Sequence, residues 1–321
     1  MGQKGKAPGR SHREGISLLE LAEIFPDEDA ARTWFEAMVW PHGRECPHCG
    51  SEDTYEGTHR SMPYRCRSCW KNFSVRTGTV LACSRLPLRK WAYAIYLDVT
   101  SLKGVSSMKL HRDLKVTQKT AWFMQQRLRE VFADLVPDSE KMAGPVEVDE
   151  AYFGGLEKNK HASKKLNAGR GPVGKTAVVG ARDRATGQVV AQVVPNTQAA
   201  TLQGFVEERR VPNAPVYTDG STAYDGLSNR EAVQHSVGEY VRDQAHINGM
   251  ESFWATLKRA HKGTFHRLSA KHLQRYVAEF AGRHNIRDFD TADQMAHVAA
   301  AMVGHRLMYR DLIAGERGVA T

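Results

Sequence analysis

The chain has 321 residues, which is long enough for two or three domains with buried cores. Its 45 Lys and Arg residues exceed its 36 Asp and Glu residues, so the formal net charge is +9 at pH 7. Such an excess favours a polyanionic partner. We do not expect that partner to be a membrane, because the sequence has no run of about 18 apolar residues and begins without the apolar core of a signal peptide.

The first 40 residues predict a basic arm followed by two short helices. Residues 1–15 are polar and basic, which predicts a disordered arm. Residues 16–40 predict two amphipathic helices, the first of which begins with a capping box formed by Ser17 and Glu20. We expect the apolar side chains of these helices to lie in a core, namely Leu18, Leu19, Leu21, Ile24, Trp34, Phe35 and Met38.

Four of the five cysteines form two C-x-x-C pairs within residues 41–82, with 16 residues between the pairs. Thiolates at this spacing hold a structural zinc ion, and the segment between them forms a β-hairpin, so the sequence predicts a zinc ribbon with one Zn²⁺. The predicted ligands are Cys46, Cys49, Cys66 and Cys69. His48 is a weaker rival ligand, and we expect the fifth cysteine, Cys83, to be a small buried side chain.

Residues 83–140 predict helices, two of which are joined by a short turn around residues 115–117. Ser106 or Ser107 and Thr117 are suited to cap these helices. This pattern resembles a helix-turn-helix and predicts a DNA-binding region, whereas a plain helical hairpin with a solvated basic face explains it equally well. The polar side chains that the second helix offers to a DNA groove are Gln118, Lys119, Gln125, Arg127 and Arg129.

From residue 141 to residue 290 the hydrophobic pattern changes to that of strands separated by helices. Strands are predicted at residues 146–150 and 214–219, with a hairpin between them that turns at residues 185–187. A helix before the last strand and a long helix after it would flank the sheet, so the predicted class is α/β with a mixed sheet. Residues 291–321 are expected to add a C-terminal helix.

Three acidic side chains stand at strand and helix positions that suit a metal site. Asp149 lies in the first strand, Asp219 lies at a strand tip, and Glu251 shares one helix face with Trp254 and Lys258. Carboxylate oxygens suit Mg²⁺ or Mn²⁺, and two such ions can activate an attacking oxygen and stabilise a leaving one. The pattern therefore indicates phosphoryl transfer, with the three acids as ligands and Lys258 at a phosphate.

Each acid also has a structural explanation, as a turn former, a helix ion pair or a solvated strand end. Glu147 and Glu150 are rivals of Asp149, because strand alternation alone does not exclude Glu147. Asn248 is the rival ligand on the helix. The Lys-rich segment 156–175 suits either a loop that grips phosphates or a solvated linker.

The order of these motifs resembles that of a known family. The ribbon C-P-H-C-G with Y-R-C-R-S-C-W, the runs V-E-V-D-E-A-Y-F-G-G and Y-T-D-G-S-T-A-Y, and the helix H-I-N-G-M-E-S-F-W-A-T-L-K-R look like the ISXO-type transposases of bacterial insertion sequences, the insertion-sequence family 1595. The similarity covers roughly residues 18–290. It implies a ribonuclease H-like catalytic core with a D-D-E metal triad, preceded by the zinc ribbon and the helical DNA-binding region.

The resemblance places the triad on Asp149, Asp219 and Glu251 and the basic residue that follows it on Lys258. It implies metal-dependent cleavage of transposon ends and transfer of the freed 3′-OH into target DNA. The implied partners are double-stranded DNA and further copies of the chain on paired ends, in the bacterial cytoplasm at the nucleoid. The alternatives are a zinc-ribbon DNA-binding regulator with structural acids, and a ribonuclease H-like nuclease that hydrolyses DNA without joining it.

Overall fold

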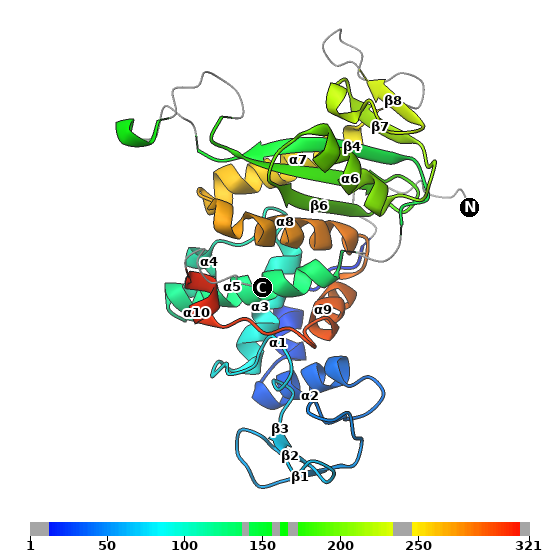
Figure 1. Ribbon diagram of the computed structural model, residues 1–321. Helices are drawn as coiled ribbons and strands as arrows, with labels where there is room; N and C mark the ends of the chain where they lie inside the picture. Colours follow the sequence, from blue (N-terminus) through cyan, green and yellow to red (C-terminus); the bar gives the residue numbers. More distant parts are fainter. Residues whose placement is uncertain (1–12, 137–140, 156–160, 166–172, 234–245, 315–321) are drawn as a thin grey trace, which may run out of the picture. The chain divides into compact units, whose positions relative to one another are not determined.

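The computed structural model describes residues 13–136, 141–155, 161–165, 173–233 and 246–314 (Figure 1). The predicted basic arm falls outside these residues except for its end, and so does most of the Lys-rich segment. The chain divides into a ribbon unit of residues 1–101, 105–131 and 286–321, and a sheet unit of residues 102–104 and 132–285. In the part of the chain that the structure describes, every helix is too short or too polar to span a membrane.

The ribbon unit is made of helices and one small sheet. Its three-stranded antiparallel sheet, in the order β1-β2-β3, belongs to the cysteine-rich segment, and β1 and β2 form the predicted hairpin. The elements are α1 (Leu18–Ile24), α2 (Glu28–Val39), β1 (Thr54–Glu56), β2 (Tyr64–Cys66), β3 (Asn72–Phe73), α3 (Leu88–Thr100), α4 (Ser107–Leu114), most of α5 (Gln118–Asp134), α9 (Thr291–Ala300) and α10 (Tyr309–Ile313).

The first helix begins as predicted but buries less than predicted. Ser17 Oγ accepts a hydrogen bond from the backbone N–H of Glu20 at 3.2 Å, and Glu20 Oε2 accepts one from the backbone N–H of Ser17 at 2.7 Å, which is the predicted capping box. The prediction that Leu18, Leu19 and Ile24 lie in a core is wrong, since they are 63%, 78% and 43% exposed. The helix has seven residues and turns a single face inward, on which Leu21 is buried completely.

The predicted pair of helices is present as α4 and α5. Ser106 and Thr117 cap them, and Lys115 takes the left-handed conformation in the turn, with φ +47°. Gln118 and Lys119 are exposed at the start of α5. The exposed basic surface of α5 is therefore confined to the first turn of the helix and to the loop of residues 115–117 that precedes it.

The prediction that Gln125, Arg127 and Arg129 offer polar contacts to DNA is wrong, because all three are buried. The physical reason is that they satisfy the protein's own groups. Gln125 donates to the carbonyl of Val105, and Arg127 donates to the carbonyl of Ala82 at 3.0 Å.

The sheet unit contains one five-stranded sheet in the order β6-β5-β4-β7-β8. β4, β5 and β6 pair antiparallel, whereas β7 pairs parallel with β4, and β8 with β7. This is the predicted mixed α/β sheet of a ribonuclease H-like fold. The elements are β4 (Val146–Phe153), η2 (Ala162–Lys164), β5 (Thr176–Asp183), β6 (Val189–Val194), α6 (Ala199–Arg209), β7 (Val216–Asp219), η3 (Thr222–Tyr224), β8 (Arg230–Val233), α7 (Asn248–Ala260), η5 (His261–Phe265) and α8 (Ala270–Asn285).

The hairpin between β5 and β6 turns where the sequence predicts. Gly187 has φ +73°, a conformation that favours glycine, and Asp183 Oδ1 accepts from the backbone N–H of Ala185 at 2.7 Å. Strand β8 was not predicted, because its four residues carry a single buried apolar side chain, Val233.

Helices cover both faces of the sheet (Figure 1). Val146 and Val148 of β4 belong to the core under α6, whereas Ala151 and Phe153 belong to the core under α7 and α8. Side chains alternate along a strand, so Asp149 shares the α7 face with Ala151 and Phe153. Alternation also places Glu150 on the opposite face.

Helix α7 packs closely on the sheet at Gly180. A Cβ atom added to Gly180 would overlap the Met250 side chain and lie 2.8 Å from Trp254 Cζ2. Gly180 is also the cross-strand partner of Asp149. The absence of a side chain at this position therefore sets how near α7 comes to the acid.

We expect Gly180→Ala to lower the free energy of unfolding of the sheet unit by about 1–3 kcal/mol, because the new methyl group overpacks this core. Equilibrium urea unfolding measures the change. Gly204→Ala in α6 is the matched control, because nothing lies within 4 Å of its added Cβ. The control should stabilise α6 by up to about 1 kcal/mol through helix propensity. Equal losses in both variants would contradict the close packing at Gly180.

Candidate metal centre and active site

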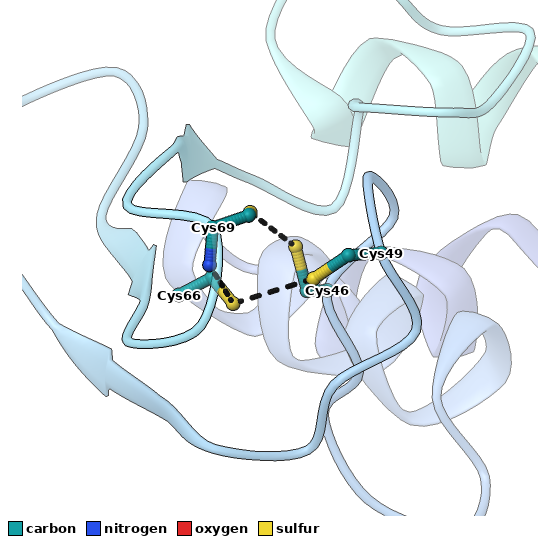
Figure 2. A group of neighbouring side chains, drawn as sticks. All are labelled: Cys46, Cys49, Cys66 and Cys69. Atoms are coloured by element: carbon teal, nitrogen blue, oxygen red, sulfur yellow. Dashed lines mark hydrogen bonds between the residues drawn. The ribbon is translucent and has the colours of Figure 1, made fainter.

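The four predicted zinc ligands converge in the ribbon unit (Figure 2). Their Sγ atoms all lie within 4.8 Å of one another. Cys46 Sγ lies 3.6 Å from Cys69 Sγ, and Cys49 Sγ lies 3.6 Å from Cys66 Sγ, so each close pair joins the two C-x-x-C motifs. Zn–S bonds of about 2.3 Å in a tetrahedron separate the sulfurs by about 3.8 Å, whereas a disulfide needs about 2 Å.

Hydrogen bonds within the cluster favour the thiolate form of Cys66, whereas burial raises the pKa of Cys46 and of Cys49. The backbone N–H of Cys69 donates to Cys66 Sγ at 3.5 Å, and this bond is the leading cause that lowers the pKa of Cys66 to about 6. A thiolate is the form that binds zinc. The four cysteines therefore fit a Zn²⁺ ion without a further ligand, and His48, which is exposed, is not part of the cluster.

Cys83 lies outside this cluster, and the prediction that it is buried is wrong, because the residue is exposed. It has φ +60° and follows a tight turn in which the backbone N–H of Ala82 donates to the carbonyl of Thr79 at 2.9 Å. The turn directs its side chain outward, which a sequence pattern for a single cysteine does not reveal.

In the sheet unit, the pairing of β4 with β7 brings two of the predicted acids together. Glu147 is the register partner of Tyr217, and Asp149 and Asp219 follow two residues further along these parallel strands. Both acids are half-buried. Asp219 Oδ1 accepts from the backbone N–H of Ser221 at 3.1 Å, which holds the turn that follows the strand.

The charges of the two acids act on each other. Burial, and after it the negative charges of Glu150 and Asp219, raise the pKa of Asp149 to about 7. Lys258 of α7 opposes this rise, so its ammonium group is within electrostatic reach of Asp149. A cation beside Asp149 and Asp219 would relieve the same repulsion, and hard carboxylate oxygens are the donors that Mg²⁺ prefers. The pair therefore fits a divalent cation.

The two rival acids of β4 have other partners. Glu150 points to the opposite face, where Tyr224 Oη donates to its Oε2 at 2.7 Å. Burial raises the pKa of Glu150, and the bond from Tyr224 opposes that rise. Glu147 is completely buried and accepts hydrogen bonds from Arg182 and Arg184.

Helix α7 carries the remaining predicted residues. Glu251 lies in its first turn and Lys258 in its last, and both are exposed. Among the described residues, the only acids, histidines or cysteines that gather three or more ligand atoms within 4.8 Å of one another are the four cysteines. The structure thus brings Asp149, Asp219 and Lys258 into electrostatic contact, and it does not join Glu251 to them in a compact cluster.

An arginine that the sequence analysis missed holds the turn after Asp219. Arg230 of β8 donates to Thr218 Oγ1 at 2.8 Å and to the carbonyls of Asp219 and Ser221, each at 3.0 Å. It also pairs with Asp225. No strand was predicted at residues 230–233, so the sequence pattern gave no signal for this role.

Comparison with known proteins agrees with this arrangement. Residues 141–285 match the ISXO2-like transposase domain, and residues 26–72 match the transposase zinc-ribbon domain. The chain is 32% identical over 282 residues to an uncharacterized protein in transposable element ISH50 of Halobacterium salinarum, which covers 82% of this chain and 93% of that protein. The chain belongs to the ISXO2-like transposase family.

A second relative supports the same conclusion over a shorter segment. The chain is 34% identical over 102 residues to an uncharacterized transposase-like protein of Haemophilus influenzae, which covers 30% of this chain and 81% of that protein. An ISXO2-like transposase carries a DDE transposase domain, which implies phosphoryl transfer and DNA binding. The relatives come from an archaeon and a bacterium.

We expect the ISXO2-like transposase to contain one zinc ion per chain, and we expect Cys49→Ser to weaken zinc binding at least tenfold, because a structural site needs all four thiolates. Cys83→Ser is the matched control, since this exposed cysteine lies outside the cluster. Competition with a chromophoric chelator measures the affinity. Equal zinc retention by both variants would contradict the four-cysteine site.

We expect a pH dependence of stability from Asp149 in metal-free buffer. Its pKa in the folded state, about 7, lies above the ordinary value of 3.8, so the folded state binds more protons between these values. This contribution to stability is complete below about pH 4 and is lost as the pH rises through about 7. Asp149→Asn should therefore be more stable than the wild type at pH 8, with the difference vanishing near pH 4, as measured by urea unfolding. A difference independent of pH would contradict the raised pKa.

Proposed function

We propose that this ISXO2-like transposase cleaves the ends of its transposon and joins the freed 3′-OH to target DNA in a divalent-metal-dependent reaction. The observation that carries the proposal is the pair Asp149 and Asp219 at equivalent positions on adjacent parallel strands, where burial, and after it the charges of Glu150 and Asp219, raise the pKa of Asp149 to about 7. Two carboxylates held this close suit a bound cation better than water. Family membership supplies the substrate class, which is DNA.

In the proposed reaction, Asp149, Asp219 and Glu251 hold two Mg²⁺ or Mn²⁺ ions. Ions bound there would polarise the attacking oxygen and stabilise the leaving oxygen at the scissile phosphate. The β4–β7 pairing orients the first two carboxylates, and Arg230 keeps the Asp219 turn in place through its backbone carbonyls. Glu251 comes from the first turn of α7 and completes the set.

Lys258 is proposed to contact a DNA phosphate beside the acids. It is exposed at the end of α7 and within electrostatic reach of Asp149. An ammonium group in this position neutralises negative charge that develops on the phosphate oxygens. The same charge keeps the two carboxylates from repelling the DNA backbone in the absence of a cation.

The ribbon unit is proposed to bind the terminal inverted repeats, while target DNA reaches the sheet unit. The exposed turn between α4 and α5 carries Lys115 and is flanked by Arg112 of α4 and Lys119 of α5. A hollow of about 660 Å³ beside it is lined by Lys90 and His111 among others. The net charge of +9 supplies salt-dependent affinity for either DNA. We propose a homo-oligomer on paired ends, acting on DNA at the nucleoid in the cytoplasm.

Asp219→Asn should lower strand transfer at least a hundredfold, because it removes a metal ligand, and leave binding to the terminal repeats within twofold. The measurement uses purified protein, Mg²⁺ or Mn²⁺, and DNA that carries the inverted repeats flanking the gene. Asp149→Asn and Glu251→Gln should behave in the same way.

Glu208→Gln is the matched control, since this exposed glutamate lies on α6, across the sheet from the acids. It should leave both binding and joining unchanged. Loss of repeat binding in Asp219→Asn would count against its role as a ligand. Cleavage without joining by the wild type would favour a nuclease, and specific binding without cleavage under either metal would favour a DNA-binding regulator.

A further inference from the structure

Glu147 is a buried charge with a complete set of partners. Its side chain has no exposed surface. Oε1 accepts from Arg184 Nε at 2.9 Å and from Arg182 Nη1 at 3.3 Å, and Oε2 accepts from the backbone N–H of Met250 at 2.9 Å. A buried carboxylate with both oxygens engaged by protein donors is held in one orientation.

Two of these partners lie at the end of β5 and the third lies in α7, whereas β7 flanks Glu147 on its other side. Arg182 is the register partner of Glu147 on β5, and Tyr217 is its register partner on β7. The Arg184 guanidinium lies 4.2 Å from the centre of the Tyr217 ring, and Arg184 also donates to the carbonyl of His246, just before α7. Glu147 therefore connects three strands to the start of one helix.

Helix α7 depends on this contact because it has no cap of its own. Its N-cap residue is Ile247, which makes no side-chain cap hydrogen bond. The N–H groups of a first helical turn are unpaired within the helix and attract negative charge. Glu147 supplies a charged acceptor to the N–H of the third helical residue, Met250, from the sheet face that α7 covers.

Gly249 shows how close the approach is. A Cβ atom added there would lie 2.6 Å from Glu147 Oε2 and 2.8 Å from Arg182 Cδ. Any other residue would force the carboxylate and the helix apart. Glu251 lies two residues further along the helix, so the same contact sets the backbone position from which its side chain extends toward Asp149.

We propose that Glu147 is a positioning residue that docks the first turn of α7 and thereby sets the place of Glu251 at the metal site. The inference rests on the proposed function, since it concerns a ligand of that site. The sequence left open whether Glu147 or Asp149 is the metal ligand on β4, and this inference assigns Glu147 a different role. Both of its oxygens are committed to protein donors, so it acts on the metal through Glu251 and is not a ligand itself.

A double-mutant cycle on Mn²⁺ affinity tests this proposal, with binding followed by electron paramagnetic resonance on the zinc-loaded full chain. Glu147→Gln should weaken Mn²⁺ binding about tenfold, because partners that orient a metal ligand contribute 10–100-fold to affinity. In a Glu251→Gln background the same change should have less than a twofold effect, because the residue through which it acts is already gone. A further tenfold loss in the double variant would overturn the proposal and make Glu147 a ligand.

Hydrogen exchange gives a second readout of docking. Amide exchange in the first turn of α7 should accelerate at least tenfold in Glu147→Gln, because the Met250 N–H loses a charged acceptor. Unchanged exchange there would overturn the proposal. Glu279→Gln is the matched control, as this buried glutamate pairs with Arg283 at 3.2 Å within α8. The control should alter neither Mn²⁺ affinity nor exchange in α7.

Gly249→Ala keeps the test decisive if Glu147→Gln does not fold. It leaves the Glu147 charge in place and crowds Oε2, so it should weaken Mn²⁺ binding by a similar factor and again have little effect beside Glu251→Gln. Full Mn²⁺ affinity in Gly249→Ala would overturn the proposal.

The failure of this inference and the failure of the proposed function give different results. A wild type that binds Mn²⁺ at these acids but joins no DNA defeats the proposed strand transfer, and the cycle still reports on Glu147. A wild type that joins DNA while Glu147→Gln retains full Mn²⁺ affinity and full strand transfer defeats the positioning role alone.

Discussion

The parallel pairing of β4 with β7 is the interaction on which the candidate site depends. Parallel strands keep equivalent residues side by side, so Asp149, midway along β4, lies beside Asp219 at the end of β7 although 69 residues separate them in the chain. Antiparallel pairing would have sent one acid to the opposite edge. Burial, and after it the charges of Glu150 and Asp219, raise the pKa of Asp149, so the ionised carboxylate is unfavourable there without a cation. The fold thus stores a local electrostatic cost that ligand binding offsets.

The close packing of α7 on the sheet is what makes this arrangement specific. Gly180 and Gly249 leave room for the helix, and Glu147 satisfies its first turn with a buried charge. Burying a carboxylate is costly unless each oxygen is hydrogen-bonded, and the two arginines at Oε1 and the Met250 N–H at Oε2 meet that condition. A strand with three acids in four residues is therefore stable because each acid has a separate environment. Glu147 lies under α7, Asp149 lies beside Asp219, and Glu150 lies against Tyr224.

The ribbon unit follows a different physical rule. The strands of its sheet have two or three residues each, which is too little to bury a stable core, so four thiolates around a metal supply the missing stabilisation. The aromatic rings of Trp40, Tyr64 and Phe73 pack beside the cluster and exclude water from two of its cysteines. Polar side chains of α5 such as Gln125 and Arg127 form hydrogen bonds inside the unit. The basic surface of the α4–α5 pair is therefore confined to the turn between them and the residues beside it.

The sequence by itself determined the features that depend on local spacing. The cysteine pairs, the capping box at Ser17, the hairpin turn at Gly187 and the family motifs each lie within short segments whose geometry follows from neighbouring residues. Only the tertiary structure decided which helix covers each sheet face, because alternation shows that residues 147 and 149 share a face but not what packs on it. Only the tertiary structure also showed that Arg127 is buried and that Leu19 and Cys83 are exposed. It also set the order in which the strands of the large sheet pair, β6-β5-β4-β7-β8. Arg127 is buried, for example, because it donates to the carbonyl of Ala82, which lies 45 residues away in the chain.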